Sequence, residues 1–263
     1  MVAKTLRGLA LLLGAAMWTF YALRPREFFA GDFPQFYVLG RLALDGRFTE
    51  LQDGGALSQA VQALVSPAIH WTLLPVYPPQ VAMLFAPLSA LPYRVAERAW
   101  LIISAALYVV VLGVLLRRCR ALQAHRLTAW MVALAAPAAF QVLFFGQLSM
   151  VALACLVFGF AALDDRRPFV AGLCFGLLAY KPQYGLALAV VFLSARAWPV
   201  IAGAIVSGLG QFGVAWLIGG SAVIVRYSEV VREMLDYRAT LQSKTHFLES
   251  LLPVVQLLPA AVV

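Results

Sequence analysis

The sequence predicts an all-α, polytopic membrane protein, and three observations support this fold class. Of the 263 residues, 63% are hydrophobic and 12% are charged, whereas a soluble domain averages about a quarter charged residues. Uncharged runs cover 99–116, 127–163 and 197–225, and a helical span needs roughly 20 apolar residues. No segment has the alternation of a membrane barrel. We therefore expect residues 1–263 to form one multi-span helical domain.

The basic character of the chain, with a pI of 9.8, does not indicate a nucleic-acid partner. The Lys and Arg residues sit in short loops between apolar runs and form no extended stripe. Cys119, Cys155 and Cys174 have no CxxC or Cys/His spacing, so neither a disulfide framework nor a zinc site is expected. The sequence also lacks the phosphate-loop and dinucleotide signatures of nucleotide-using enzymes.

The first expected span covers residues 6–23. Bulky Trp18, Phe20 and Tyr21 stand where small residues would precede signal-peptide cleavage, so this segment is predicted to be an uncleaved anchor. Residues 24–98 follow as a long outer loop with six basic and six acidic residues.

Three short helices are expected within this loop. The first covers residues 33–44. The second, 56–65, has an apolar face and a polar face, so it is predicted to lie at the membrane interface. Its apolar face consists of Leu57, Val61, Leu64 and Val65. The third, 79–91, is too short to cross and contains Pro87, which favours a re-entrant or surface-lying helix.

Further spans are expected over the long apolar runs. A hinge at residues 146–149 divides the longest of these runs in two. The expected spans are 97–116, 127–145, 148–163 and 198–219.

Residues 168–195 carry one charge, Lys181, at their centre. Each half is about 20 Å long as a helix and falls short of a bilayer core of about 30 Å. Two alternatives stay open, an interrupted span or a hairpin of two short helices. Residues 226–249 are of mixed charge and are expected to form a second outer loop. The apolar C-terminus stops abruptly, so we expect a chain that lacks further spans.

Orientation follows from the distribution of Lys and Arg. With the N-terminus, 117–126, 164–167 and Arg196 inside, these segments hold nine basic residues against two acids, and the remaining segments hold eleven against ten. The inner face then carries 7 of the net +8 charge (9 − 2 = 7). This topology predicts a plasma (inner) membrane protein and requires the hairpin at 168–195 and a non-crossing helix at 79–91.

Polar interruptions gather on the outer side of this topology, where such groups usually line a site. Asp32 begins a patch that includes Tyr37, and it is equally well interpreted as a helix N-cap or as a catalytic base. Lys181 precedes Pro182 and could snorkel, or could bind phosphate beside a helix N-terminus.

Three further residues have simple structural interpretations, and Gln147 and His246 also have a functional alternative. Gln147 beside Gly146 would satisfy carbonyls freed at a hinge or would contact substrate. Tyr77 would anchor the chain at the interface, with Pro78 starting a helix. His246 in the second outer loop is a surface histidine by default, and a phosphate or acceptor contact is the alternative.

Several short motifs together resemble glycosyltransferase family 87, which uses polyprenyl-phosphate sugars and has the GT-C membrane fold. Their order and spacing over residues 31–190 make the resemblance fairly specific. The motifs are Gly31-Asp32-Phe33, Phe36-Tyr37, Gly40-Arg41, Asp45-Gly46, Tyr77-Pro78-Pro79, Phe85-Ala86-Pro87-Leu88, Leu91-Pro92-Tyr93, Ala99-Trp100, Gly146-Gln147, Ala171-Gly172-Leu173, Gly176-Leu177 and Lys181-Pro182-Gln183. Family members look longer, so this chain is expected to be a C-terminally truncated member.

The resemblance implies an inverting transfer of a hexose, commonly mannose, from a polyprenyl-phosphate donor to a hydroxyl of a glycolipid or glycan at the outer, periplasmic face. Asp32 would be the general base. Lys181, helped by Arg41 or His246, would neutralise the phosphate, and Gln147, Tyr37 and Tyr77 would contact substrate. The scheme needs no metal or other cofactor, because fixed cations serve the phosphate.

Two alternatives from other classes are a transporter or lipid flippase and a non-catalytic membrane scaffold. Transporters usually have repeated halves with matching broken helices, but here 168–195 is the one broken segment in the sequence pattern. The long outer loop with its acid after the first span favours the enzyme.

Overall fold

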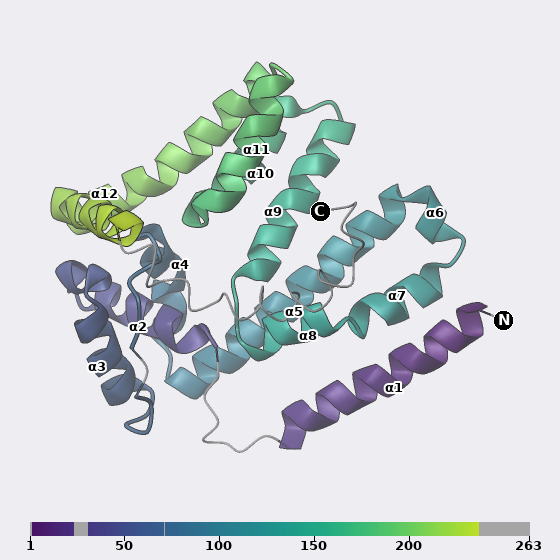
Figure 1. Ribbon diagram of the computed structural model, residues 1–263, viewed down its shortest axis with the longest axis horizontal. Coiled ribbons are helices and arrows are strands. Elements are labelled where there is room, and N and C mark those ends of the chain that lie inside the picture. The colour runs from purple at the N-terminus through teal and green to yellow at the C-terminus, as the bar shows by residue number, and fades with distance from the viewer. Residues whose placement is uncertain (1, 24–30, 71, 237–263) are drawn as a thin grey trace, which may run out of the picture.

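The computed structural model describes residues 2–23, 31–70 and 72–236, and these residues form helices and no strand (Figure 1). The all-α prediction is therefore confirmed for this part of the chain. Within the described residues, three helices are long and apolar enough to cross a membrane, and a bent pair of shorter helices would make a fourth span. The long helices are α1 (Val2–Leu23), α5 (Tyr93–Arg118) and α12 (Trp198–Asp236).

The loop between the first two long helices folds into a separate group of short helices, at the left of Figure 1. They are α2 (Phe33–Leu44), the 3-10 turn η1 (Phe48–Gln52), α3 (Gly54–Leu64) and α4 (Gln80–Ser89). The expected helices at 33–44, 56–65 and 79–91 are thus confirmed. On the predicted apolar face of α3, Leu57 and Val61 are buried and Leu64 is exposed. α4 continues through Pro87 to Ser89.

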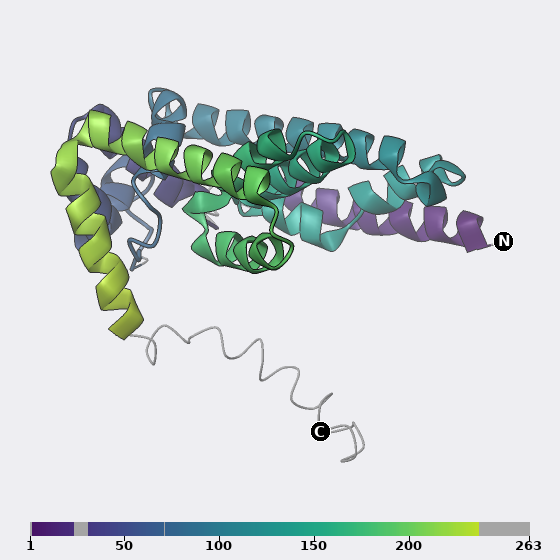
Figure 2. The ribbon, with the colours of Figure 1, turned by 90° about the horizontal axis from the view of Figure 1, so that it is seen from above.

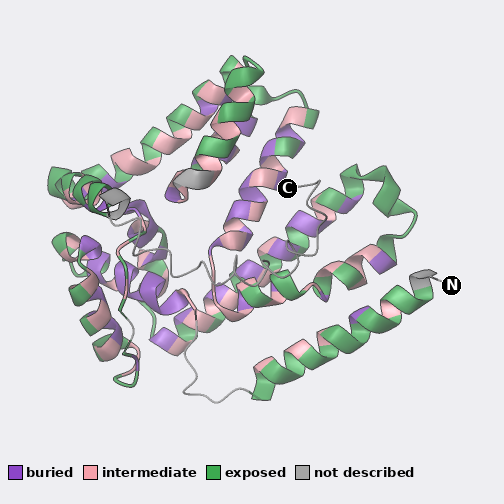
Figure 3. Ribbon diagram, viewed as in Figure 1, coloured by how far each residue is buried: buried purple, intermediate pink, exposed green. Residues whose placement is uncertain are grey.

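This group encloses the main apolar core. Phe36, Leu42 and Phe85 are fully buried, and the rings of Phe36 and Phe85 stack at 4.8 Å between centroids. α2 and α4 approach closely at Gly40, where a Cβ atom would lie 2.3 Å from the Ser89 hydroxyl. The long helices contrast with this core, and Figure 3 shows α1 almost wholly exposed. Exposed apolar side chains on a long helix are expected where lipid surrounds it.

The expected span at 127–145 is wrong as a continuous helix. The structure has α7 (Arg126–Leu134) and α8 (Pro137–Phe144), which meet at an angle of 43°. Pro137 has no N–H and disfavours helical geometry in the residue before it. Ala136 accordingly has an extended backbone, with ψ of 122°.

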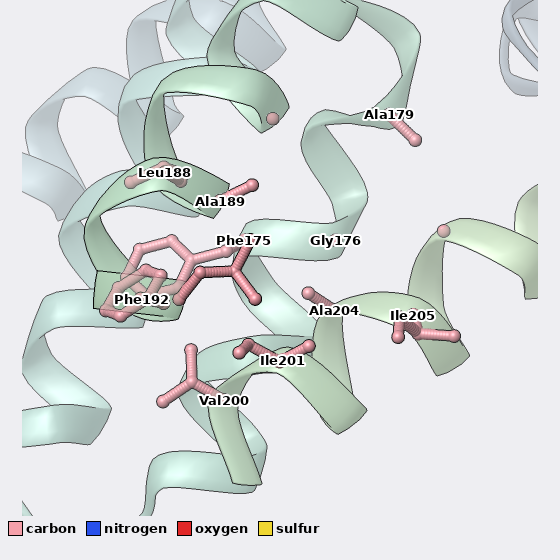
Figure 4. A pocket seen from close by; sticks show the side chains of 13 residues that line it. Phe175, Gly176, Ala179, Leu188, Ala189, Phe192, Val200, Ile201, Ala204 and Ile205 are labelled. Carbon is pink, nitrogen blue, oxygen red and sulfur yellow. The ribbon is translucent and has the colours of Figure 1, made fainter. Parts of the chain in front are cut away.

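The segment around Lys181 forms a hairpin. α9 (Ser149–Asp164) leads into α10 (Pro168–Gly176), the 3-10 turn η2 (Leu177–Tyr180) and α11 (Pro182–Ser194). The rings of Phe175 and Phe192 lie 5.2 Å apart, and Figure 4 shows them together with Leu188. In a continuous helix these two residues would be about 25 Å apart, so α11 folds back along α10.

The topology collects the predicted inner segments at one end of the bundle. Arg118, at the end of α5, forms an ion pair of 2.8 Å with Asp165 after α9, which holds the pKa of the Asp165 carboxyl below its ordinary value. Arg7 donates to the Thr128 hydroxyl at 2.8 Å. Ala197 packs in the same cluster as Ala162. The basic segments that the sequence assigns to the inner side therefore lie together at one end of the bundle.

α12 starts beside this basic end and crosses to the other end, where it bends sharply (Figure 2). Gly220, with φ of 77°, lies at the bend. A Cβ atom on the preceding Gly219 would lie 3.2 Å from the ring of Phe48 in η1. Residues 226–236, which the sequence assigns to a second outer loop, lie in the part of α12 beyond the bend.

Candidate functional site

Asp32 stands where the start of α2 crosses the break between α8 and α9. Its N–H donates to the Phe145 carbonyl at 2.9 Å. Gly31 has φ of +86°, and a Cβ atom there would lie 2.2 Å from the same carbonyl oxygen. Across the contact, Gly146 has φ of +61° and a Cβ atom would lie 2.7 Å from that of Phe33. Glycine is required on both sides because left-handed backbone and this close approach exclude a side chain.

The Asp32 carboxylate does not cap α2. Although Asp32 occupies the N-cap position, its side chain makes no capping hydrogen bond. The hydroxyl of Tyr77 donates to Oδ2 of Asp32 at 3.3 Å, across 45 residues of sequence. Of the two interpretations of Asp32, the geometry disfavours the structural cap.

Tyr77 is held firmly beside this carboxylate. Its ring packs edge-on against Phe36, with 4.8 Å between centroids, and its carbonyl accepts from Gln52 Nε2 at 3.1 Å. Burial and, secondly, the Asp32 charge raise the pKa of the Tyr77 phenol far above its ordinary value. Tyr77 consequently stays protonated and remains a hydrogen-bond donor to Asp32 at any physiological pH.

The helix break after α8 frees two carbonyls, and groups that are distant in the sequence satisfy both. The Asp32 N–H donates to the Phe145 carbonyl, and the indole of Trp100 donates to the Gly146 carbonyl at 2.9 Å. The hydroxyl of Tyr180 donates at 3.0 Å to the Leu148 carbonyl, which also accepts from the Ala152 N–H at the start of α9. Such satisfaction is obligatory at membrane depth. The expected partner, Gln147, instead accepts from Ser149 at 3.5 Å.

Lys181 comes to this end of the bundle through its neighbour Tyr180. The Tyr180 hydroxyl donates to the Leu148 carbonyl, and Tyr180 packs in the same apolar cluster as Tyr77. α11 begins directly after Lys181, and the Lys181 ammonium lies 5.9 Å from the ring centre of Tyr184. The break at Lys181 and the carboxylate of Asp32 therefore belong to the same end of the molecule.

Other expected site residues lie elsewhere. Arg41 pairs with Asp45 at 3.3 Å and follows Asp32 by nine residues, roughly 13 Å along a helix. Tyr37 is buried and donates its hydroxyl to the Leu91 carbonyl at 2.9 Å. His246 lies outside the residues that the structure describes.

Tyr180 and Gln80 were not singled out by sequence reasoning, and Trp100 entered only through the Ala99-Trp100 motif. The signals were present but weak, because an aromatic residue in an apolar segment usually packs in the core. Gln80 is the clearest, as an amide directly after Pro78-Pro79 in an otherwise apolar stretch.

The arrangement suits proton transfer. A half-buried carboxylate with a neutral phenol beside it is able to accept a proton from a bound hydroxyl. Within residues 2–23, 31–70 and 72–236, no group of three or more His, Cys, Asp or Glu side chains is placed to hold a metal ion.

Comparison with known proteins identifies one family. The model of glycosyltransferase family 87 matches residues 76–260, a range that includes Tyr77 and Lys181 and begins after Asp32. A polyprenol-phosphate-mannose-dependent alpha-(1-2)-phosphatidylinositol pentamannoside mannosyltransferase of Mycolicibacterium smegmatis is 30% identical over 199 residues. The alignment covers 74% of this chain and 45% of that relative, so the chain spans about half of its length. No solved structure matches.

Proposed function

The chain belongs to glycosyltransferase family 87, and we propose that it transfers a hexose, with mannose as the first candidate, from a polyprenyl-phosphate donor to a hydroxyl of a glycolipid or glycan. The family supports the transfer, and the name of the relative supports the donor. The observation that carries the proposal is the Asp32 carboxylate, which does not cap its helix and which lies 3.3 Å from the Tyr77 hydroxyl.

The proposed reaction inverts the anomeric centre. The acceptor oxygen attacks the anomeric carbon from the face opposite the phosphate and forms the new C–O bond. The bond between that carbon and the phosphate oxygen breaks, and polyprenyl phosphate leaves with the electron pair. Asp32 takes the acceptor proton as attack proceeds and then loses it to water. Tyr77 orients the carboxylate through its hydrogen bond.

Lys181 is the proposed partner of the departing phosphate. Lys181 directly precedes α11, a helix of 13 residues, and the N-termini of helices favour bound anions. Fixed positive charge beside the leaving group stabilises the charge that develops there during transfer. In this scheme Asp32 and Lys181 act on opposite sides of the anomeric carbon.

We place the Asp32 end of the bundle at the outer face of the plasma membrane. The support is the charge partition, since the clustered Lys and Arg residues favour the inner face. In α5, Arg118 follows Trp100 by 18 residues, about 27 Å of helix, and Trp100 donates to the Gly146 carbonyl beside Asp32. Arg118 and Asp32 therefore lie at opposite ends of the bundle, and placing one end inside places the other outside.

Cys119 provides a direct test of this orientation, because it is exposed and directly follows α5 at the basic end. In intact cells a membrane-impermeant maleimide is expected to leave Cys119 unlabelled and to label it after permeabilisation. As the matched outer control, Ala63→Cys on exposed α3, in a Cys119→Ser background, should be labelled in intact cells. Labelling of Cys119 without permeabilisation would reverse the orientation.

A transfer assay tests the function. Membranes that contain the full-length gene product are supplied with radiolabelled polyprenyl-phosphate mannose and compared with membranes from cells without the gene. We expect gene-dependent appearance of label in glycolipid or glycan, with the anomeric configuration opposite to that of the donor. Retained configuration contradicts the inverting mechanism. Movement of the intact donor between the leaflets of a vesicle membrane, with no transfer from any lipid-linked sugar, indicates a flippase instead.

A further inference from the structure

Among the grooves along α12 in the described structure, two that lie against other helices differ in polarity. The groove between α10, α11 and α12 has a volume of about 260 Å³ and is lined by carbon side chains and glycines (Figure 4). The groove between α4, α9, η2 and α12 is larger, about 410 Å³, and three of its lining residues are polar. Those three are Gln80, Tyr180 and Gln211.

Gln80 is the unusual member of this larger groove. It is 8% exposed, and neither its amide nitrogen nor its amide oxygen has a hydrogen-bond partner among the described residues. Gln211 differs, because its amide nitrogen donates to the carbonyls of Gly176 and Ser207 at 2.9 and 3.1 Å. Burying an amide with both ends unmet is unfavourable. A bound molecule that meets both ends would remove this cost.

The groove adjoins the Asp32 site. Gln80 is the first residue of α4 and follows Tyr77 by three positions, and Tyr77 donates to Asp32 at 3.3 Å. Tyr180 lines the same groove and packs in the same apolar cluster as Tyr77. The groove therefore adjoins the cluster that holds Tyr77 against the Asp32 carboxylate.

The chemistry of the unmet amide selects the kind of ligand. A primary amide both donates and accepts, and so does a hydroxyl, whereas a phosphodiester oxygen only accepts and would leave the Gln80 oxygen unmet. The remaining wall, which includes Val81, Leu84 and Val151, suits hydrocarbon. We propose that Gln80 binds a hydroxyl of the transferred sugar while this apolar wall holds the adjoining lipid of the donor. The inference rests on the proposed function.

A cycle of enzyme and substrate changes tests this contact. Wild type and Gln80→Leu are each assayed with polyprenyl-phosphate mannose and with its 2-, 3-, 4- and 6-deoxy analogues. In the wild type one deoxy position should lower kcat/KM at least about tenfold, because a site built to bind a hydroxyl rejects the analogue that lacks it. For Gln80→Leu, kcat/KM with the parent donor should fall by a similar factor. The deoxy analogue at that position should then have the same kcat/KM as the parent donor.

Thermal unfolding in detergent separates this contact from a structural role. Gln80→Leu is expected to keep or raise the midpoint temperature, since it removes unmet polar atoms, whereas Gln211→Leu should lower it by removing two hydrogen bonds. The proposed contact is overturned if Gln80→Leu has a lowered midpoint temperature and still discriminates against the deoxy analogues as the wild type does. The proposed function stands in that case, because the wild type still transfers the sugar. A wild type that transfers from no lipid-linked sugar overturns both.

Discussion

Asp32→Asn is expected to lower kcat/KM for transfer from polyprenyl-phosphate mannose by about a hundred- to ten-thousandfold, the usual contribution of a general base. Asparagine keeps the size of the side chain but cannot take a proton. The hydrogen bond from Tyr77 still has an amide oxygen to accept it, so folding should be little affected. The measurement is initial transfer rate in membranes that contain equal amounts of each variant.

Asp45→Asn is the matched control for this experiment. Asp45 belongs to the same loop but its side chain is 39% exposed and pairs with Arg41, and an exposed ion pair contributes little. Its transfer rate should stay within about twofold of wild type. Tyr77→Phe should fall between the two, because the base is kept and its orienting hydrogen bond is lost. Undiminished transfer by Asp32→Asn would remove Asp32 from the reaction.

Gly203→Ala is expected to destabilise the protein by about 1–3 kcal/mol, the usual cost of an added methyl in a packed interior. At this position α12 crosses α10 with the backbones in contact. A Cβ atom on Gly203 would lie 2.2 Å from the Phe169 carbonyl oxygen, and one on Gly172 would lie 2.0 Å from that of Val200. Backbone cannot yield as a flexible side chain does, so the helices must separate. Small residues at crossings of this kind are typical of membrane helices.

Gly210→Ala provides the control for this change in the same helix. A Cβ atom on Gly210 meets nothing within 4 Å, and alanine favours helix over glycine. The midpoint temperature in detergent should therefore stay equal or rise for Gly210→Ala and fall for Gly203→Ala. Equal midpoints for the two variants would contradict the close crossing of α10 and α12.

Local sequence properties predicted most helices and the position of the candidate base. α2 was expected over residues 33–44 and is Phe33–Leu44. The hydropathy of α1, α5 and α12 identified the long spans. These predictions succeed because the local pattern of apolar residues and the free energy of transferring one segment from water to lipid determine where helices and spans form. The charge partition similarly grouped segments that the structure brings together, such as those of Arg118 and Asp165.

Other features could not be predicted from the hydropathy of single segments. The break before Pro137 was not predicted, because the segments before and after it are both apolar and read as one uncharged run over 127–145. Arg41 was expected to assist at the phosphate, and the structure adds its pairing with Asp45. Gln147 was expected to satisfy hinge carbonyls, but the Asp32 N–H and the Trp100 indole satisfy those of Phe145 and Gly146.

Composition and periodicity were thus sufficient for an all-α membrane chain with an acidic residue at the start of α2. The folded chain was needed to distinguish a helix cap from a carboxylate that binds a distant side chain, since the Tyr77 hydroxyl donates to Asp32 across 45 residues. It was also needed to choose a hairpin at Lys181, through the contact of Phe175 with Phe192. The physical reason is the same in both cases. Hydropathy acts on each segment alone, whereas hydrogen bonds and close packing are satisfied by atoms that are neighbours only after folding.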